Sequence, residues 1–160
     1  MHRNILSESQ LHARGTNAVA ALLERHLIVP KIFFDAAWPV KTSRVDVLAV
    51  DRAGSGDIHV VEVTVGKQHP GETISRVMQL PAHFKYVALI ANGNYLPTLK
   101  SLYAPDDGPG RIGVIQIVEV GDELKAEFRY RPERFRVDPT VIKQIDRFTA
   151  RHQADIELRA

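Results

Sequence analysis

Two segments rich in β-branched residues, RVDVLAVD (44–51) and DIHVVEVTV (57–65), are separated by a short stretch that contains two glycines. Segments of this composition on either side of a short glycine-containing turn predict an antiparallel hairpin. Both carry apolar residues on the two alternating faces, as expected of central strands that are covered on both sides. The rest of the chain must therefore supply layers above and below this pair.

The pattern of the remaining chain predicts such layers. Ser7 and Ser9 are candidate N-caps for a helix from about Glu8 to His26, whose apolar residues recur at helical spacing. A helical segment at 73–80 lies between the strand at 57–65 and another at 84–91, which predicts a parallel pair joined by a right-handed crossover. The other expected elements are a strand at 31–40, a short helix at 96–103, strands at 112–120 and 124–131 joined by a Gly121-Asp122 turn, and a last helix from Asp138-Pro139 to about His152.

This order of elements predicts an α/β fold: a mixed sheet flanked by helices, with an α-β-β-β-α-β core followed by further strands and a helix. No stretch of the 160 residues has the composition of a linker, so we expect a single domain over residues 1–160.

Composition narrows the function classes. The chain has no cysteine, which excludes disulfides and thiolate metal sites and fits a cytoplasmic protein. No apolar run is long enough to span a bilayer, and the first residues lack a signal-peptide core, so no membrane partner is expected. The net charge of +2 is compatible with nucleic acid but does not by itself indicate it.

Two acidic residues occur inside the apolar strands of the hairpin. Asp46 shares a face with Leu48, and Glu62 shares a face with Val60 and Thr64. If the strands are neighbours in a suitable register, the two carboxylates converge, and a divalent cation would remove their repulsion. Oxygen ligands of this kind favour Mg²⁺ or Mn²⁺, and such a site suits attack of water on a phosphodiester.

An Asp in one strand, a short turn and Glu-x-Lys in the next strand, between two helices, form the core of the PD-(D/E)xK nuclease superfamily, which this chain resembles over about Gln10 to Ala91. The resemblance implies a restriction-endonuclease-like fold and a Mg²⁺- or Mn²⁺-dependent nuclease acting on DNA. It implies Asp46 and Glu62 as metal ligands, the backbone carbonyl of Val63 as a third, and Glu24 of the first helix as an additional one. A homodimer is compatible with it.

The chain departs from this family at one motif position, where Thr64 stands in place of lysine. The family's lysine orients the attacking water and stabilises charge in the transition state. A threonine hydroxyl can hold a water but carries no charge. We expect Thr64 and Lys67, three residues further on, to share this role. Other candidates near the site are Arg76 and Gln79 on the following helix and Lys41 and Arg44 before Asp46.

Other interpretations of the same residues stay open. The chain could be a family relative that has lost catalysis and binds nucleic acid or protein, which Thr64 favours, or an unrelated α/β protein that binds a partner through a sheet edge. Glu62 could face solvent on an edge strand, and Asp46 could pair with Arg44 or Arg76. Glu24 could belong to a solvated helix face, and Lys67 could be an ordinary loop lysine.

The seven histidines form no metal-binding motif. We expect His59 to be half-buried on the face opposite Glu62, and His69 and His83 to lie at the surface. The segment RYRPERFR places four arginines beside aromatic residues, which predicts either a nucleic-acid contact or the outward face of a solvated edge strand. The arginines are Arg129, Arg131, Arg134 and Arg136, and the aromatic residues are Phe128, Tyr130 and Phe135.

Overall fold

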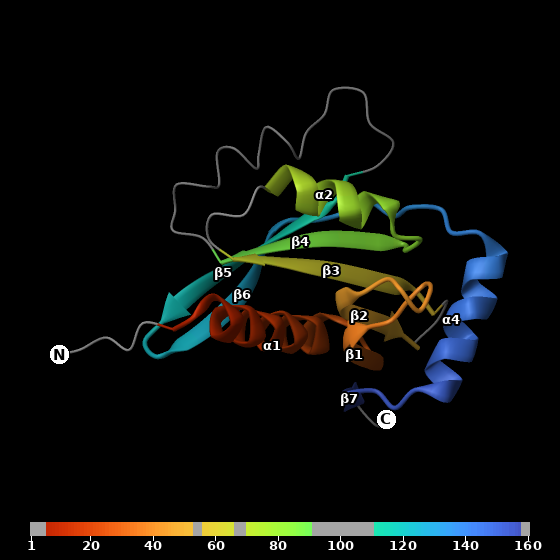
Figure 1. The fold of residues 1–160 in the computed structure, drawn as a ribbon, viewed down its shortest axis with the longest axis horizontal. Helices are drawn as coiled ribbons and strands as arrows, with labels where there is room; N and C mark the ends of the chain where they lie inside the picture. The colour runs from red at the N-terminus through yellow and green to blue at the C-terminus, as the bar shows by residue number, and fades with distance from the viewer. Residues whose placement is uncertain (1–5, 53–55, 66–69, 91–110, 158–160) are drawn as a thin grey trace.

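A computed structural model describes residues 6–52, 56–65, 70–90 and 111–157. Within these ranges one helix precedes three strands, a second helix precedes three more, and a third helix precedes a last short strand (Figure 1). They are α1 (Glu8–His26), β1 (Pro30–Ala36), β2 (Val45–Asp51), β3 (Ile58–Val65), α2 (Pro70–Gln79), β4 (Phe84–Ile90), β5 (Gly113–Val120), β6 (Glu123–Tyr130), α4 (Pro139–Arg151) and β7 (Ile156–Glu157).

The strands form one seven-stranded mixed sheet in the order β6-β5-β4-β3-β2-β1-β7. β2 runs antiparallel to both β1 and β3, and the β2–β3 pairing confirms the predicted hairpin. β3 and β4 are parallel and are connected through α2, which confirms the predicted strand-helix-strand unit. β5 is parallel to β4 and antiparallel to β6, with Gly121 at a positive φ of 64° in the β5–β6 turn. The α/β class with a mixed sheet is therefore confirmed.

Helix α1 covers one face of the sheet. It begins with a complete capping box, in which the Ser7 side chain accepts from the Gln10 N–H while the Gln10 side chain accepts from the Ser7 N–H. Its apolar stripe, which includes Val19 and Leu23, packs on side chains such as Val61 from that face. The first helix therefore starts and ends at the predicted residues.

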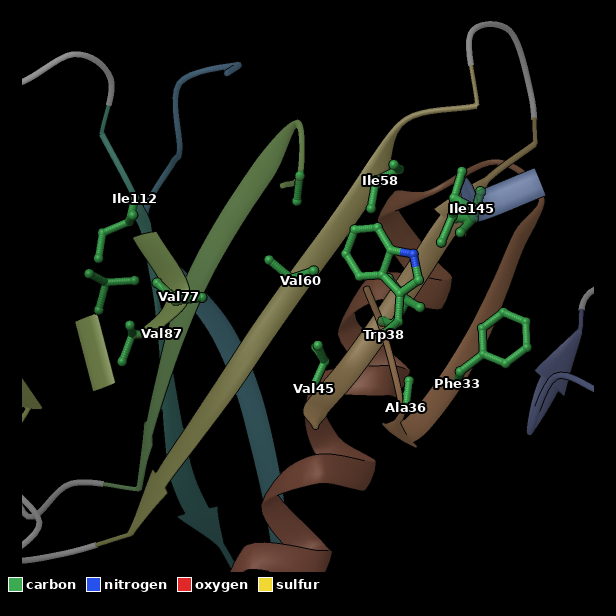
Figure 2. Close-up of a cluster of buried hydrophobic side chains, with 14 of the residues drawn as sticks. Phe33, Ala36, Trp38, Val45, Ile58, Val60, Val77, Val87, Ile112 and Ile145 are labelled. Carbon is green, nitrogen blue, oxygen red and sulfur yellow. The ribbon is translucent and has the colours of Figure 1, made fainter. Parts of the chain in front are cut away.

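The opposite face is covered by α2 and α4, and Figure 1 shows α1 and α2 on opposite sides of the central strands. Figure 2 shows the indole of Trp38 lying among Ile58, Val60 and Ile145, which come from β3 and α4. With helices on both faces, every residue of β3 is buried. The hairpin is thus the centre of a three-layer structure, as its composition predicted.

Several boundaries differ from the sequence-based expectation. β1 ends at Ala36 rather than at residue 40, ahead of the cis Trp38-Pro39 bond. α2 begins at Pro70, three residues earlier than expected, and β7 is a two-residue strand that was not predicted. The short helix expected at 96–103 lies outside the described residues.

The last helix starts as predicted, with Asp138 as N-cap accepting from the Thr140 N–H at 2.8 Å and Pro139 at the first helical position. Among the described helices, none is both long enough and apolar enough to cross a membrane.

Candidate functional site

Glu62 lies in the middle of β3 with 4% of its surface exposed. It shares the α2-covered face with Val60 and Thr64, whereas His59 and Val61 face α1. The interpretation that Glu62 faces solvent on an edge strand is therefore wrong. β3 is a central strand, because β2 pairs with one of its edges and β4 with the other.

Asp46 lies near the start of β2 and meets Glu62 from the neighbouring strand. The β2–β3 ladder pairs Val50 with Ile58 and Val47 with Val61, which brings Asp46 opposite Glu62 at the next position. A side-chain hydrogen bond joins the two carboxyl groups. The predicted convergence of these two acids is confirmed.

A hydrogen bond between two carboxyl groups requires one proton. Burial, the hydrogen bond to Asp46 and the charge of Asp46 together raise the pKa of Glu62 to about 8. Glu62 is therefore mainly protonated at neutral pH and donates to Asp46. The positive charge of Arg76, from α2, acts on the same carboxyl group and opposes this rise in its pKa.

Asp46 accepts from two further donors. The backbone N–H of Val63 donates to its Oδ2 at 2.8 Å, beyond the last paired residues of the β2–β3 ladder. His12 Nε2 of α1 lies 3.3 Å from the same oxygen. Asp46 thus joins α1, β2 and β3 at one carboxylate, rather than pairing with Arg44, whose guanidinium donates to the carbonyl of Asp35.

Sequence analysis did not identify His12 as part of this site. The signal was its helical spacing, because His12 lies four and seven residues before Thr16 and Val19, both of which face the sheet. An imidazole on the sheet-facing side of the first helix can reach an acidic residue on the strands beneath it. Histidine motifs of metal sites have short spacings along the chain, whereas this contact joins residues 34 positions apart.

The other predicted site residues lie in different surroundings. Thr64 is buried, and its hydroxyl lies 3.3 Å from that of Thr73 in α2. Glu24 follows His12 by 12 residues in α1, a separation of about 18 Å at 1.5 Å per residue, so the structure does not bring it to the acid pair. Lys67 lies outside the described residues.

The acid pair must be compared with what a metal ion needs. Within the described ranges, no three His, Asp or Glu side chains are grouped as a ready-made metal site. Mg²⁺ is commonly held by one or two carboxylates and keeps several waters, so Asp46 and Glu62 provide the minimum set of protein ligands. The backbone N–H of Val63 donates to Asp46. The role of the Val63 carbonyl as a metal ligand remains a prediction.

Two histidines expected to be less enclosed are buried. His59 is 5% exposed rather than half-buried, and burial lowers its pKa to about 4. His83 is also buried rather than at the surface, and its Nδ1 accepts from the Ile58 N–H at 2.9 Å. Phe84, Tyr86 and Phe128 lie around His59, and the segment after β6 reaches His83, whose carbonyl accepts from the Phe135 N–H. Short-range sequence patterns do not reveal such contacts.

Comparison with known proteins adds information about the fold. No family model matches the chain, and no curated protein matches it. A solved structure, the SPO1766 protein of unknown function from Silicibacter pomeroyi, is similar with a TM-score of 0.61 and 18% sequence identity, covering 91% of this chain and 90% of that one. At this identity the likeness concerns the fold alone.

Proposed function

We propose that this protein is a Mg²⁺- or Mn²⁺-dependent nuclease with a restriction-endonuclease-like, PD-(D/E)xK-type core that hydrolyses DNA phosphodiester bonds. The observation that carries the proposal is the acid pair: Asp46 and Glu62 meet from adjacent strands of an apolar sheet, where Glu62 is buried and the Asp46 side chain is 22% exposed. A buried carboxyl pair is costly unless it serves a purpose such as binding a cation.

In this proposal Asp46 and Glu62 hold the metal ion, which when bound would polarise the phosphate and favour ionisation of the attacking water. Glu62 must release its proton before it can serve as a ligand. His12, 3.3 Å from Asp46, would donate to that carboxylate and orient it toward the metal. Glu24 has no part in the site, because it lies near the opposite end of α1.

The basic group of the family motif needs a replacement, since Thr64 is uncharged and its hydroxyl is paired with Thr73. Arg76 is the described cation whose charge acts on Glu62. We assign to Arg76 the stabilisation of developing negative charge on the phosphate, with Lys67 as the alternative source of that charge.

A second candidate function is a nuclease-like domain without catalysis that binds nucleic acid or protein. The proton shared by Asp46 and Glu62 favours it, because the pair is already satisfied without a metal. The buried Thr64–Thr73 contact points the same way, since it fills the family's lysine position with a neutral pair.

Calorimetric titration with Mn²⁺ and Mg²⁺, followed by incubation with plasmid and single-stranded DNA, tests the proposal. We expect wild-type protein to bind metal more tightly as pH rises toward 8, because Glu62 then loses its proton more readily. Asp46→Asn should lower DNA cleavage by at least about 100-fold. Glu24→Gln is the matched control and should leave both measurements unchanged.

Absence of metal binding at millimolar concentration in wild-type protein would overturn the nuclease proposal. Metal binding without cleavage of either DNA would favour the second candidate function. Arg76→Gln should reduce cleavage while leaving metal affinity close to that of wild type, which separates charge stabilisation from metal binding.

A further inference from the structure

A cavity of about 250 Å³ opens on the α1 side of the sheet, away from the acid pair. It lies at the C-terminal end of α1 and the N-terminal ends of β3 and β4, whereas the acid pair contacts His12 near the start of α1. Most of its lining side chains are rings or carry a positive charge. They are His26, His59, Phe84, Tyr86, Phe128 and Arg131.

The rings of this cavity support one another. His59 stacks on Phe84 with ring centroids 4.8 Å apart and planes 20° from parallel. Phe128 meets Tyr86 at 5.8 Å and contacts His26 edge-on at 4.8 Å. Because the rings come from α1, β3, β4 and β6, the sheet and helix hold the walls in place, and a planar ligand would meet a preformed ring-lined surface.

The polar groups of the cavity are neutral inside and positive at the mouth. His59 is uncharged at neutral pH, since burial lowers its pKa to about 4, and its Nδ1 lies 3.2 Å from the Tyr86 hydroxyl. This hydrogen bond uses the Nδ1 atom of His59, so the other ring nitrogen, Nε2, can bond to a ligand. At the mouth, Arg131 lies 4.0 Å over the Phe128 ring. Loss of hydration lowers the pKa of His26, and the charges of Arg131 and Arg25 lower that pKa further.

These features select a ligand with two parts. A planar ring with hydrogen-bonding edges suits the neutral, ring-lined interior, because base–aromatic stacking and a neutral imidazole tolerate an uncharged heterocycle. A negative group suits the mouth, where Arg25 and Arg131 create positive potential. The volume is below the usual range for drug-sized ligands, so it suits a one- or two-ring compound.

We propose that this cavity binds a nucleobase, with the attached phosphate at Arg131. The base could belong to a free nucleotide or to an unpaired nucleotide of a single strand, and both present the same chemistry. The proposal is independent of the nuclease function, because none of the cavity's lining residues belongs to the acid pair.

Binding measurements in the presence of EDTA test the proposal without any contribution from a metal site. The probes are adenosine, adenosine monophosphate, ribose 5-phosphate and a single-stranded oligodeoxynucleotide. Saturation-transfer NMR and calorimetry measure the binding of each probe. We expect adenosine monophosphate or the oligonucleotide to bind and ribose 5-phosphate not to bind. Binding of the monophosphate identifies a free nucleotide as the source, and binding of the oligonucleotide alone identifies a single strand.

Two variants test where the base and the phosphate bind. Phe128→Leu should weaken binding of the base-containing probe by about 5- to 150-fold, the range expected for loss of one stacking contact. Arg131→Gln should weaken the phosphate-containing probes while leaving any binding of adenosine unchanged. Arg129→Gln is the matched control, because Arg129 lies over Tyr130 at 5.9 Å and does not line the cavity.

The proposal is overturned if no base-containing probe binds at millimolar concentration, or if ribose 5-phosphate binds as well as adenosine monophosphate. Equal effects of Arg131→Gln and Arg129→Gln would also overturn it, because they would indicate general attraction to positive charge. Arg131 lies on the surface side of the ring cluster, so this comparison stays informative if Phe128→Leu does not fold.

Discussion

At the scale of single residues, the proton shared by Asp46 and Glu62 is the feature with the clearest consequence. The two carboxyl groups meet from the neighbouring strands β2 and β3, where Glu62 is buried and Asp46 is partly exposed. Removing both from water is costly, and one proton lowers that cost by leaving a single negative charge. Asp46 then accepts from Glu62, Val63 and the nearby His12.

We predict that the free energy of unfolding contributed by Glu62 falls as pH rises from about 4.5 to about 8. The unfolded chain releases the Glu62 proton near 4.5, whereas the folded protein keeps it up to about 8. The folded state therefore binds more protons in this window, and stability falls by at most about 1.4 kcal/mol per pH unit.

Glu62→Gln should remove this dependence, because an amide can donate to Asp46 but does not titrate. Urea denaturation at several pH values between 5 and 8 measures the slope in wild type, Glu62→Gln and the control Glu24→Gln. Identical slopes in wild type and Glu62→Gln would show that Glu62 does not hold its proton in the folded protein.

At the scale of elements, the pairing of β4 and β5 places Tyr86 beside Gly113, where there is no room for a larger side chain. A Cβ built at Gly113 would lie 2.6 Å from Cδ1 of Tyr86 and 3.0 Å from Cδ of Pro132. Both neighbours are rings with little freedom to move, and Tyr86 is held by His59 on its other side. The glycine thus leaves room for the Tyr86 ring, which lines the cavity on the α1 side of the sheet.

We predict that Gly113→Ala lowers the free energy of unfolding by about 1–3 kcal/mol, the usual effect of overpacking. It should also weaken binding of any nucleobase probe, because Tyr86 must shift. Thermal denaturation and the binding measurements described above check both effects. Val120→Ala, at an exposed position of the same strand, is the control and should change neither quantity appreciably.

An unchanged melting temperature in Gly113→Ala would mean that Tyr86 and Pro132 move at little cost. Helix α1 offers a comparison: a Cβ at Gly15 would lie 2.7 Å from Cδ1 of Ile90, the far end of a flexible side chain. The same nominal overlap is therefore expected to be less costly at Gly15 than at Gly113.

At the scale of the whole molecule, buried groups respond to pH in opposite directions. Glu62 makes the folded protein less stable as pH rises, whereas the buried histidines make it less stable as pH falls. Burial lowers the pKa of His59 to about 4 and lowers that of His83 below its usual value of 6.5. We therefore expect maximal stability at an intermediate pH.

We predict that wild-type protein loses stability as pH falls below about 6.5, because the unfolded chain then takes up protons that His59 and His83 resist in the folded state. His83→Asn should reduce this loss between pH 6.5 and 5, since the amide oxygen can still accept from the Ile58 N–H but does not titrate. Chemical denaturation over this range measures it, with His152→Asn at an exposed position as control. A variant as acid-sensitive as wild type would show that His83 does not contribute.

Much of the fold could be predicted because its signals are local. The capping residues and apolar spacing of α1, the β-branched hairpin and the Asp138-Pro139 helix start all depend on neighbours a few residues apart. Alternation along β2 and β3 also indicated that Asp46 and Glu62 would meet, because strand parity and a short turn restrict the register. By contrast, β7 consists of two residues that pair with β1 from the far end of the chain, and no local pattern marks them.

The sequence by itself determined the class of fold, the mixed sheet and the meeting of two acids, since periodicity and turn chemistry act over short distances. Only the tertiary structure decided which groups surround those acids. It brought His12 to Asp46 and the charge of Arg76 to Glu62, paired Thr64 with Thr73, and separated Glu24 from the site. It also assembled the ring-lined cavity from four elements. These contacts depend on how helices cross a twisted sheet, which packing of the whole core determines.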